Sequence, residues 1–243
     1  DDSVPQPITS APVAVRHPDG GYMVSFGTGK YLERTDVENI DVQTFYGIWD
    51  NRIDGSVVEV TGRDQLVEQK VLAVVPVNGY DYRITSDNAV DYAEKRGWYM
   101  DLPTTGERVV FNPIVRPLRT VFVTLIPIAS DPCAGGGSGW VMELDYLSGA
   151  RFRVSPFDVN GDFTISDLDL VTFTPTEGEP SVSVTVGGVN LGGGIPTTPT
   201  VLALSGQEGE LKFVSGTKGG IGKVFEFNPD DYGRISWRQI LGE

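Results

Sequence analysis

Short β-prone segments, separated by turns rich in glycine and proline, run through almost the whole chain. The 243 residues include 30 glycines and 16 prolines, and stretches with helical periodicity are scarce. A Pro-Asp-Gly turn at residues 18–20 predicts a hairpin between strands at residues 13–16 and 22–26. Many short strands joined by turns are typical of sandwiches, barrels and propellers. We therefore predict an all-β (mainly β) fold.

Further strands are predicted wherever β-branched or aromatic residues gather between turns. Asn78-Gly79 predicts a second hairpin, between a long strand at residues 66–77 and a return strand at 82–85. The remaining predicted strands are residues 45–49, 56–61, 97–102, 108–111, 118–126, 140–145, 150–154, 182–186, 200–205, 211–214 and 223–227. Helices are predicted to be short and to lie in part of residues 33–42, in residues 86–95 and in residues 167–172.

The net charge of the chain is −14, from 33 acidic and 19 basic residues. An anionic surface cannot neutralise phosphates, so we expect no nucleic-acid partner. The charge fits a secreted or cell-surface protein that meets millimolar cations. The longest apolar runs, such as residues 121–128, are too short to span a bilayer, and we expect no transmembrane segment. Two acidic residues open the chain, which argues against a signal peptide within it.

One loop carries the spacing of an EF-hand calcium site. Residues 158–169 read D-x-N-x-D followed by a final Asp at position twelve. A hard cation needs six to eight oxygens, and alternate residues of a tight loop can supply them. The predicted ligands are the side chains of Asp158, Asn160 and Asp162, the backbone carbonyl of Thr164, Ser166 directly or through water, and Asp169 as the closing ligand. The predicted cofactor is Ca²⁺.

The loop departs from the usual form at two positions. Phe163 replaces the usual glycine at position six, and a left-handed backbone there costs about 1–2 kcal/mol. Position twelve is Asp169 rather than the longer Glu, so Asp167 is an alternative closing ligand if the loop is tighter. The alternative to a calcium site is an acid-rich surface turn that binds no metal.

Cysteine and histidine are too scarce for several kinds of site. Cys133 is the only cysteine and His17 the only histidine, which excludes an internal disulfide and a structural zinc site of several thiolates. Cys133 either lies near a turn or pairs with a cysteine outside this chain. His17 lies in a turn sequence, and a catalytic triad built on it is not expected. We therefore predict no enzymatic activity. The alternative is a secreted propeller enzyme, such as a hydrolase or a quinone-dependent dehydrogenase.

Tryptophan and glycine occur in several distinctive patterns along the chain. Gly-Trp-x-Met followed by an acid occurs at residues 97–101 and 139–143, a separation that matches one propeller blade. Trp49, Trp98, Trp140 and Trp237 are expected to fill a core between sheets rather than to form a sugar platform. The glycine runs at residues 135–139 and 192–194 lack the features of phosphate loops and predict chain reversals.

Eight short phrases, in this order, resemble the C-terminal region of PilY-type proteins. These proteins are large tip adhesins and assembly factors of bacterial type IV pili. The phrases are QPITSAP at 6–12, FGTGKY at 26–31, YGIWD at 46–50, GWYMDL at 97–102, GWVMELD at 139–145, FDVNGD at 157–162, GIPTTP at 194–199 and GRISWR at 233–238.

The resemblance implies that residues 1–243 form a single β-rich domain, the C-terminal part of a larger β-propeller. It implies an exported protein at the cell surface, pilus tip or outer membrane. The implied roles are pilus assembly, control of extension and retraction linked to calcium, twitching motility and surface attachment. The implied partners are pilus proteins such as minor pilins, a host or abiotic surface, and the remainder of the propeller. The family's known calcium loop has nine residues, whereas the loop at Asp158 has the twelve-residue form. A purely structural, calcium-stiffened scaffold remains the second alternative.

Overall fold

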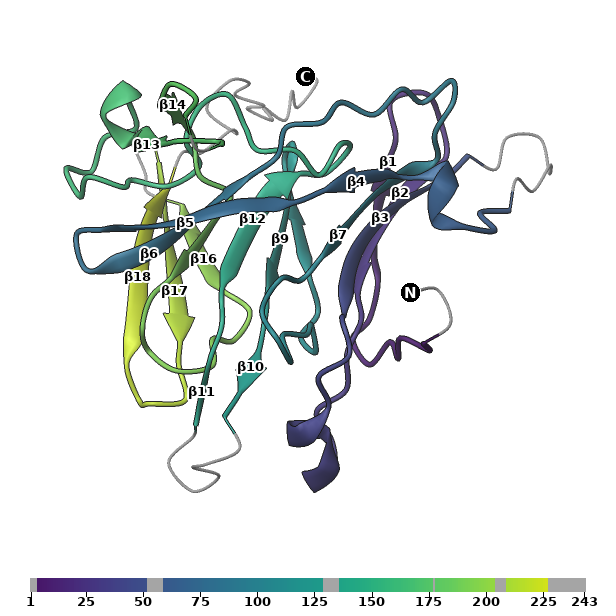
Figure 1. The fold of residues 1–243 in the computed structure, drawn as a ribbon, viewed down its shortest axis with the longest axis horizontal. Helices are drawn as coiled ribbons and strands as arrows, with labels where there is room; N and C mark the ends of the chain where they lie inside the picture. Colours follow the sequence, from purple (N-terminus) through teal and green to yellow (C-terminus); the bar gives the residue numbers. More distant parts are fainter. Residues whose placement is uncertain (1–3, 52–58, 129–135, 177, 204–208, 227–243) are drawn as a thin grey trace, which may run out of the picture.

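The computed structural model describes residues 4–51, 59–128, 136–176, 178–203 and 209–226. In these residues the chain forms eighteen β-strands and three short 3₁₀ helices, which confirms the mainly β prediction. The strands form three larger sheets and two small hairpins (Figure 1). Within this described part of the chain, no helix has the length and apolar character needed to cross a membrane.

The first sheet has five strands in the order β1-β2-β3-β7-β4. The strands are β1 (Val13–Arg16), β2 (Tyr22–Gly27), β3 (Thr44–Asp50), β7 (Gly97–Asp101) and β4 (Val67–Gln69). β1 and β2 form an antiparallel hairpin with Val15 opposite Met23, which confirms the turn predicted at residues 18–20. β4 runs parallel to β7, whereas the other pairs are antiparallel.

The second sheet has six strands in the order β5-β6-β15-β12-β9-β8. The strands are β5 (Val71–Val77), β6 (Tyr80–Thr85), β15 (Gly188–Asn190), β12 (Val141–Asp145), β9 (Arg119–Val123) and β8 (Ile114–Arg116). The long strand predicted at residues 66–77 divides at Lys70 between the first sheet (β4) and the second (β5). The turn predicted at Asn78 and Gly79 is confirmed, with φ angles of 50° and 85°.

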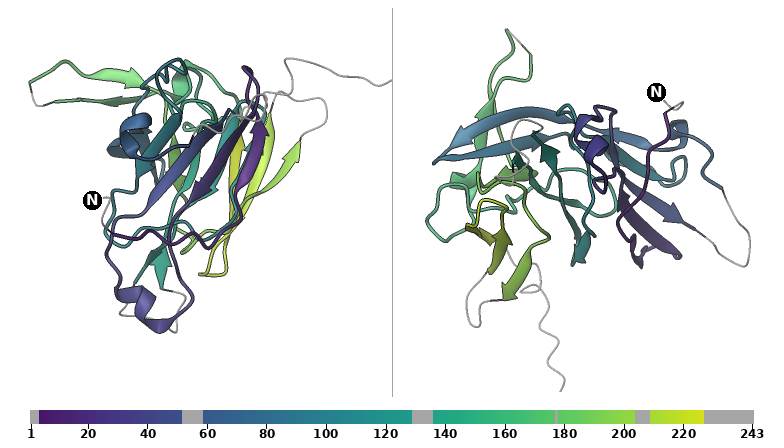
Figure 2. Two further views of the ribbon diagram at one scale, coloured as in Figure 1. Left: turned by 90° about the vertical axis from the view of Figure 1, so that its right-hand side faces the viewer. Right: turned by 90° about the horizontal axis from the view of Figure 1, so that it is seen from below.

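The third sheet is a meander of three strands at the yellow end of the chain in Figure 1. The strands are β16 (Thr200–Ala203), β17 (Glu210–Ser215) and β18 (Ile221–Glu226). The small hairpins are β10 (Ile126–Pro127) with β11 (Gly137–Ser138), and β13 (Val171–Phe173) with β14 (Val182–Val184). The β13–β14 hairpin projects from the body of the molecule in Figure 2.

The central strands β9 and β12 of the six-stranded sheet are buried on both faces, because they lie between two hydrophobic clusters. Along β9, Val121 and Val123 belong to one cluster and Phe122, between them, belongs to the other. The first cluster also contains Val214 of β17 and Val224 of β18, and the second contains Phe45 of β3. A strand with both faces buried reads as a continuous apolar run, which explains the sequence of β9.

The two Gly-Trp-x-Met-acid phrases lie at interior strands of neighbouring sheets. Trp98 is in β7, and Trp140 directly precedes β12. Both indoles belong to one cluster, where Trp98 is 0% and Trp140 is 6% exposed. With Trp49 also buried, the prediction that these tryptophans fill a core is confirmed for the three that lie in the described residues. Trp237 lies outside them.

The predicted helix at residues 86–95 is wrong, because side-chain hydrogen bonds hold its first part along β4. The amide of Asn88 donates to the carbonyl oxygen of Glu68 at 2.8 Å, and Gln69 donates to the carbonyl oxygen of Asn88 at 2.6 Å. The other helix predictions shorten to η1 (Arg34–Glu38) and η3 (Asp167–Asp169). A third such helix, η2 (Arg63–Gln65), was not predicted.

The predicted strand at residues 108–111 is also wrong. The buried guanidinium of Arg108 donates to the carbonyl oxygens of Lys30, Asp36 and Asn39 at 2.7–2.8 Å. These bonds tie the segment to η1 and to the residues on either side of it. Within the segment, only Arg108 forms a β-bridge, which pairs it with Leu125. Residues 150–154 likewise form no strand. The strand predicted at residues 56–61 lies partly outside the described residues, and Cys133 and residues 233–238 lie wholly outside them.

His17 packs in the core rather than at a solvent-exposed turn. Its ring lies 4.5 Å from that of Trp49 and 4.4 Å from that of Tyr92, measured between centroids. His17 is 5% exposed, and its Nδ1 accepts the backbone N–H of Asp19 at 3.1 Å. Burial lowers the pKa of His17 below 6.5, although Asp19 opposes this shift.

The lowered pKa of His17 predicts a dependence of stability on pH. As pH falls through 6.5, the unfolded chain takes up the proton first, so the free energy of unfolding decreases. Above pH 6.5 this contribution is constant. His17→Phe keeps a ring between Trp49 and Tyr92 but removes the titration. We expect the difference in stability between variant and wild type to change with pH below 6.5, measured by urea unfolding from about pH 5 to 8. Parallel curves would contradict this prediction.

Candidate functional site

The predicted calcium loop follows directly on a strand-like contact with β18. Phe157 is fully buried and forms an antiparallel bridge with Glu226. The backbone N–H of Asp158 donates to the carbonyl oxygen of Phe225 at 3.0 Å. On another side, the amide of Asn78 donates to the carbonyl oxygens of Val159 and Asn160, each at 3.2 Å. The loop is therefore tied both to the third sheet and to the β5–β6 turn.

Asp158 is the centre about which the loop turns. Its Oδ1 accepts the backbone N–H groups of Gly161 at 2.7 Å and Asp162 at 3.2 Å. Its Oδ2 accepts the N–H of Phe163 at 2.9 Å. Three successive amides thus point at one carboxylate, which fixes the curvature of the loop.

Asn160 and Asp162 repeat this arrangement on a smaller scale. Oδ1 of Asn160 accepts the N–H of Asp162 at 2.9 Å, and Oδ1 of Asp162 accepts the N–H of Thr164 at 2.8 Å. The amide nitrogen of Asn160 also donates to Oδ2 of Asp162 at 3.0 Å. The side chains at positions one, three and five therefore each close a local backbone ring.

Asp169 is buried and binds the loop's own backbone. Its Oδ1 accepts the N–H groups of Val159 at 2.7 Å and Asn160 at 3.2 Å, and its Oδ2 accepts that of Ser166 at 2.8 Å. Ser166 in turn accepts the N–H of Leu168 at 3.2 Å. Asp167 is exposed. The carboxylate of the last loop residue thus fixes the backbone at the start of the loop.

The donor set of the loop consists of oxygen atoms, which suits a hard cation. In the described residues, however, no three Asp, Glu, His or Cys side chains form a group that could hold a metal as they stand. Asp169 turns to the amides of Val159 and Asn160 rather than toward Asp162. A carboxylate has about four lone-pair sites, so an oxygen that accepts an amide can also bind a cation.

Asp169→Ala is expected to lower the free energy of unfolding by about 2–3 kcal/mol, because one buried and two partly buried backbone N–H groups lose a charged acceptor. Urea unfolding measures this loss. Asp167→Ala, at an exposed carboxylate of the same turn, is the control and should leave the midpoint unchanged. Equal effects of the two substitutions would contradict the role assigned to Asp169.

Phe163 has a φ angle of 62°, the left-handed conformation for which position six usually needs glycine. The ring is 69% exposed and touches Phe225 edge to face, with 5.8 Å between centroids. Relief of the backbone strain outweighs the loss of this contact, so Phe163→Gly is expected to raise the unfolding free energy by up to about 1 kcal/mol. Thermal unfolding is the readout, and a destabilised variant would contradict the expectation.

Electrostatics link the loop to the neighbouring sheet. Burial raises the pKa of Tyr82 to about 12, and the nearby carboxylates of Asp158 and Asp169 contribute to the shift. The loop is therefore a concentration of negative charge beside a buried strand. This repulsion would diminish if a cation were bound.

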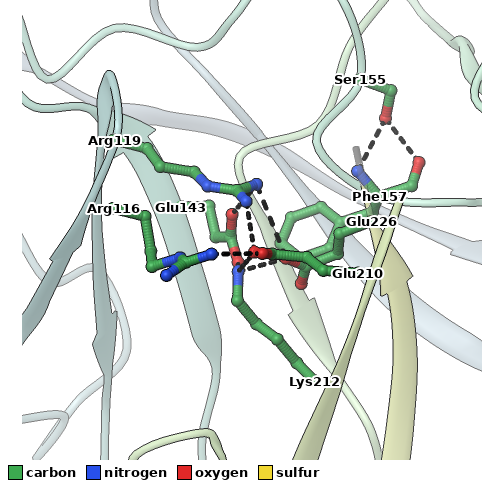
Figure 3. A network of polar contacts seen from close by, with 8 residues as sticks. All are labelled: Arg116, Arg119, Glu143, Ser155, Phe157, Glu210, Lys212 and Glu226. Atoms are coloured by element: carbon green, nitrogen blue, oxygen red, sulfur yellow. Dashed lines mark hydrogen bonds and ion pairs between the residues drawn. The ribbon is translucent and has the colours of Figure 1, made fainter. Parts of the chain in front are cut away.

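A second polar site, absent from the sequence predictions, lies beside the loop. It is a network of six charged side chains between the second and third sheets (Figure 3). We call it the charge network. Its members are Arg116, Arg119, Glu143, Glu210, Lys212 and Glu226.

Each carboxylate of the charge network has at least one cation beside it. Glu210 accepts from Arg116 at 2.6 Å and also binds Arg119, and Glu143 accepts from Arg119 at 3.1 Å. Lys212 contacts both Glu143 and Glu226. All the side chains except that of Arg116 are at most 3% exposed. Three acids and three bases therefore balance one another away from water.

The two carboxylates that share Lys212 differ in their acidity. Burial raises the pKa of Glu226 well above its usual value, and the neighbouring Glu143 adds to this. Burial acts in the same direction on Glu143, but Lys212 and Arg119 together hold its pKa below the usual value. Glu226 also has one oxygen, Oε1, with no hydrogen-bond partner. The network therefore favours a proton on Glu226 over one on Glu143.

Known proteins similar to this chain share one family description. The family model described as the PilY1 beta-propeller domain matches residues 1–74. A type IV pilus biogenesis factor PilY1 homolog of Xylella fastidiosa is 38% identical over 149 residues, which cover 59% of this chain and 10% of that protein. The type IV pilus biogenesis factor PilY1 of Pseudomonas aeruginosa strain PAO1 is 32% identical over 173 residues, covering 63% of this chain and 15% of that protein.

A solved structure extends the similarity to the fold. The crystal structure of the Pseudomonas aeruginosa PilY1 C-terminal domain superposes with a TM-score of 0.74 at 26% identity, covering 94% of this chain. The chain spans 46% of that domain and a smaller share of both curated relatives. The mainly β architecture matches that of the β-propeller domain. The sequence similarity and the shared fold together support a PilY-type C-terminal region.

Proposed function

We propose that this chain is a calcium-binding, non-enzymatic segment of a type IV pilus biogenesis factor. Support for the pilus role comes from the relatives, which are named as pilus biogenesis factors rather than as enzymes. The finer roles we propose are pilus assembly, control of extension and retraction, twitching motility and surface attachment. We propose that the protein is exported and lies at the cell surface or on the pilus. The proposed partners are minor pilins, a host or abiotic surface and the rest of the propeller.

The single observation that carries the calcium proposal is the loop at Asp158. Its side-chain oxygens at positions one, three and five each accept a backbone N–H from further along the loop, and Phe163 adopts the left-handed backbone of position six. Calcium would be held by Asp158, Asn160 and Asp162, with Thr164, Ser166 and Asp169 as further ligands. The cation would offset the repulsion among the carboxylates and would thereby order the chain between β12 and β13.

A ligand that binds only the folded state raises its melting temperature by mass action. At a free calcium concentration about a hundred times Kd, the stabilisation is about 2.7 kcal/mol, or about 5–10 °C for a domain of this size. Asp158→Asn/Asp162→Asn keeps one acceptor oxygen at each position, for the N–H groups of Gly161 and Thr164, but removes two charges and the oxygens that accept from Phe163 and Asn160. We expect the double variant to lose the shift. The control Asp64→Asn/Glu94→Gln removes two exposed charges outside the loop and should keep it.

A regulatory role and a structural role predict different outcomes in cells. With Asp158→Asn/Asp162→Asn placed in the full-length protein, regulation predicts altered piliation and twitching at a normal protein level. The structural-scaffold alternative predicts normal motility and a loss of heat stability only. The same alteration of motility in the Asp64→Asn/Glu94→Gln control would reject a specific role for the loop.

A further inference from the structure

The loop and the charge network meet on the same strand. The last two residues of β18, Phe225 and Glu226, face the first two residues of the loop segment, Phe157 and Asp158. The ring of Phe163 also contacts that of Phe225 edge to face. The side chain of Glu226 then enters the charge network, where it binds Lys212 of β17 (Figure 3). The end of β18 therefore contacts both the loop and the charge network.

The third sheet depends strongly on these contacts for its attachment. Lys212, Glu210 and Glu226 are its three charged residues in the network, and their partners Arg119 and Glu143 lie on β9 and β12 of the second sheet. Its apolar contribution includes Val214 and Val224, which belong to the cluster that also holds Phe157. At the opposite end of the hairpin, the turn between β17 and β18 is hydrogen-bonded to residues 193–197, for example from the N–H of Thr197 to the carbonyl oxygen of Ser215 at 3.0 Å. The charge network and the loop thus hold the end of the hairpin that lies away from this turn.

We propose that calcium binding to the loop is linked to the docking of the β17–β18 hairpin on the six-stranded sheet. This inference rests on the proposed calcium function. Calcium would fix residues 158–163, and hence the N–H of Asp158 and the ring of Phe163 that hold Phe225 in place. The docked hairpin would in return hold the loop in the conformation that binds calcium. Such linkage is reciprocal, so each event changes the equilibrium of the other by the same factor.

Hydrogen exchange followed by mass spectrometry tests the first direction of the linkage. Saturating calcium is expected to slow amide exchange in residues 210–215 and 221–226 by at least about fivefold. Exchange in β1, β2 and β3, on the far sheet, should stay unchanged. If calorimetry detects calcium binding but exchange in β17 and β18 is unaffected, the linkage is wrong and the calcium function stands. If calcium does not bind at all, both are wrong.

Affinity measurements test the opposite direction. Lys212→Met loosens the hairpin from a position that does not contact calcium, and it is expected to weaken calcium binding by at least about fivefold. Lys223→Met removes the same charge from an exposed position on β18 and should leave the affinity unchanged. Phe225→Leu, which keeps an apolar residue but removes the ring contact to Phe163, gives a second variant if Lys212→Met does not fold. Wild-type affinity in folded Lys212→Met or in Phe225→Leu would overturn the linkage.

Discussion

Lys212→Met is expected to lower the free energy of unfolding by about 3–5 kcal/mol. The substitution removes the cation between Glu143 and Glu226 and leaves two carboxylates together in a buried site. The methionine side chain keeps most of the volume of the lysine stem, so little of the loss comes from packing. Urea unfolding at neutral pH, with an unchanged m-value, measures the effect.

A second substitution identifies the cause of this loss. Glu226 is the carboxyl whose pKa is raised, so it carries the less favourable charge of the pair. Lys212→Met/Glu226→Gln should therefore recover a large part of the lost stability, because one buried negative charge disappears with the positive one. Lys223→Met, on the exposed face of the same hairpin, should be neutral. A single Lys212→Met variant as stable as wild type would show that the network does not hold the sheets together.

Arg83→Met is expected to cost about as much, again about 3–5 kcal/mol. The guanidinium of Arg83 binds both oxygens of Glu107, at 2.6 and 2.7 Å, and lies 4.1 Å from the ring centroid of Trp140. Arg83 is 1% and Glu107 is 0% exposed, so the substitution leaves an unpaired charge in the core. Thermal and urea unfolding should both report the loss.

Two comparisons test this account of Arg83. Glu107→Gln in the Arg83→Met background removes the orphaned charge and should restore part of the stability. Lys70→Met, which removes a cation from the exposed pair with Glu68, should be indistinguishable from wild type. If the buried and the exposed substitutions had similar effects, burial of the Arg83–Glu107 pair would not be the source of its importance.

Local sequence signals predicted those parts of the fold that depend on local chemistry. The turns at residues 18–20 and at Asn78-Gly79 were predicted because their residue types favour specific backbone angles. Apolar runs located β3, β7, β9 and β12. Residues 86–95 and 108–111 were predicted wrongly because distant hydrogen bonds, made by Asn88 and Arg108, override local preference. Short-range patterns carry no information on such partners.

The charge network could not be predicted because β17, which carries two of its members, reverses the usual pattern of burial. In β17, Glu210 and Lys212 alternate with Leu211 and Phe213, which predicts that the charged residues face solvent. The structure buries Glu210 and Lys212 instead, and Leu211 and Phe213 are only partly buried. The reversal is possible because each charge meets a partner from another sheet. That pairing depends on topology and is not visible in any one strand.

The candidate loop was visible in the sequence because its residues are contiguous. The spacing predicted the turn at Asp158 and the strain at Phe163, both of which the structure contains. It did not predict that Asp169 binds the loop's own amides or that β18 lies against the first residues of the loop. The predicted metal ligands remain a prediction.

Calcium titration by isothermal calorimetry, on the whole chain freed of metal, tests calcium binding at the Asp158 loop. We expect one calcium ion per chain for the wild type and for Asp64→Asn/Glu94→Gln, with similar affinity. We expect no measurable binding for Asp158→Asn/Asp162→Asn. Absence of calcium-dependent heat in the wild type at millimolar calcium, or wild-type affinity in the Asp158→Asn/Asp162→Asn variant, would contradict the proposed calcium site.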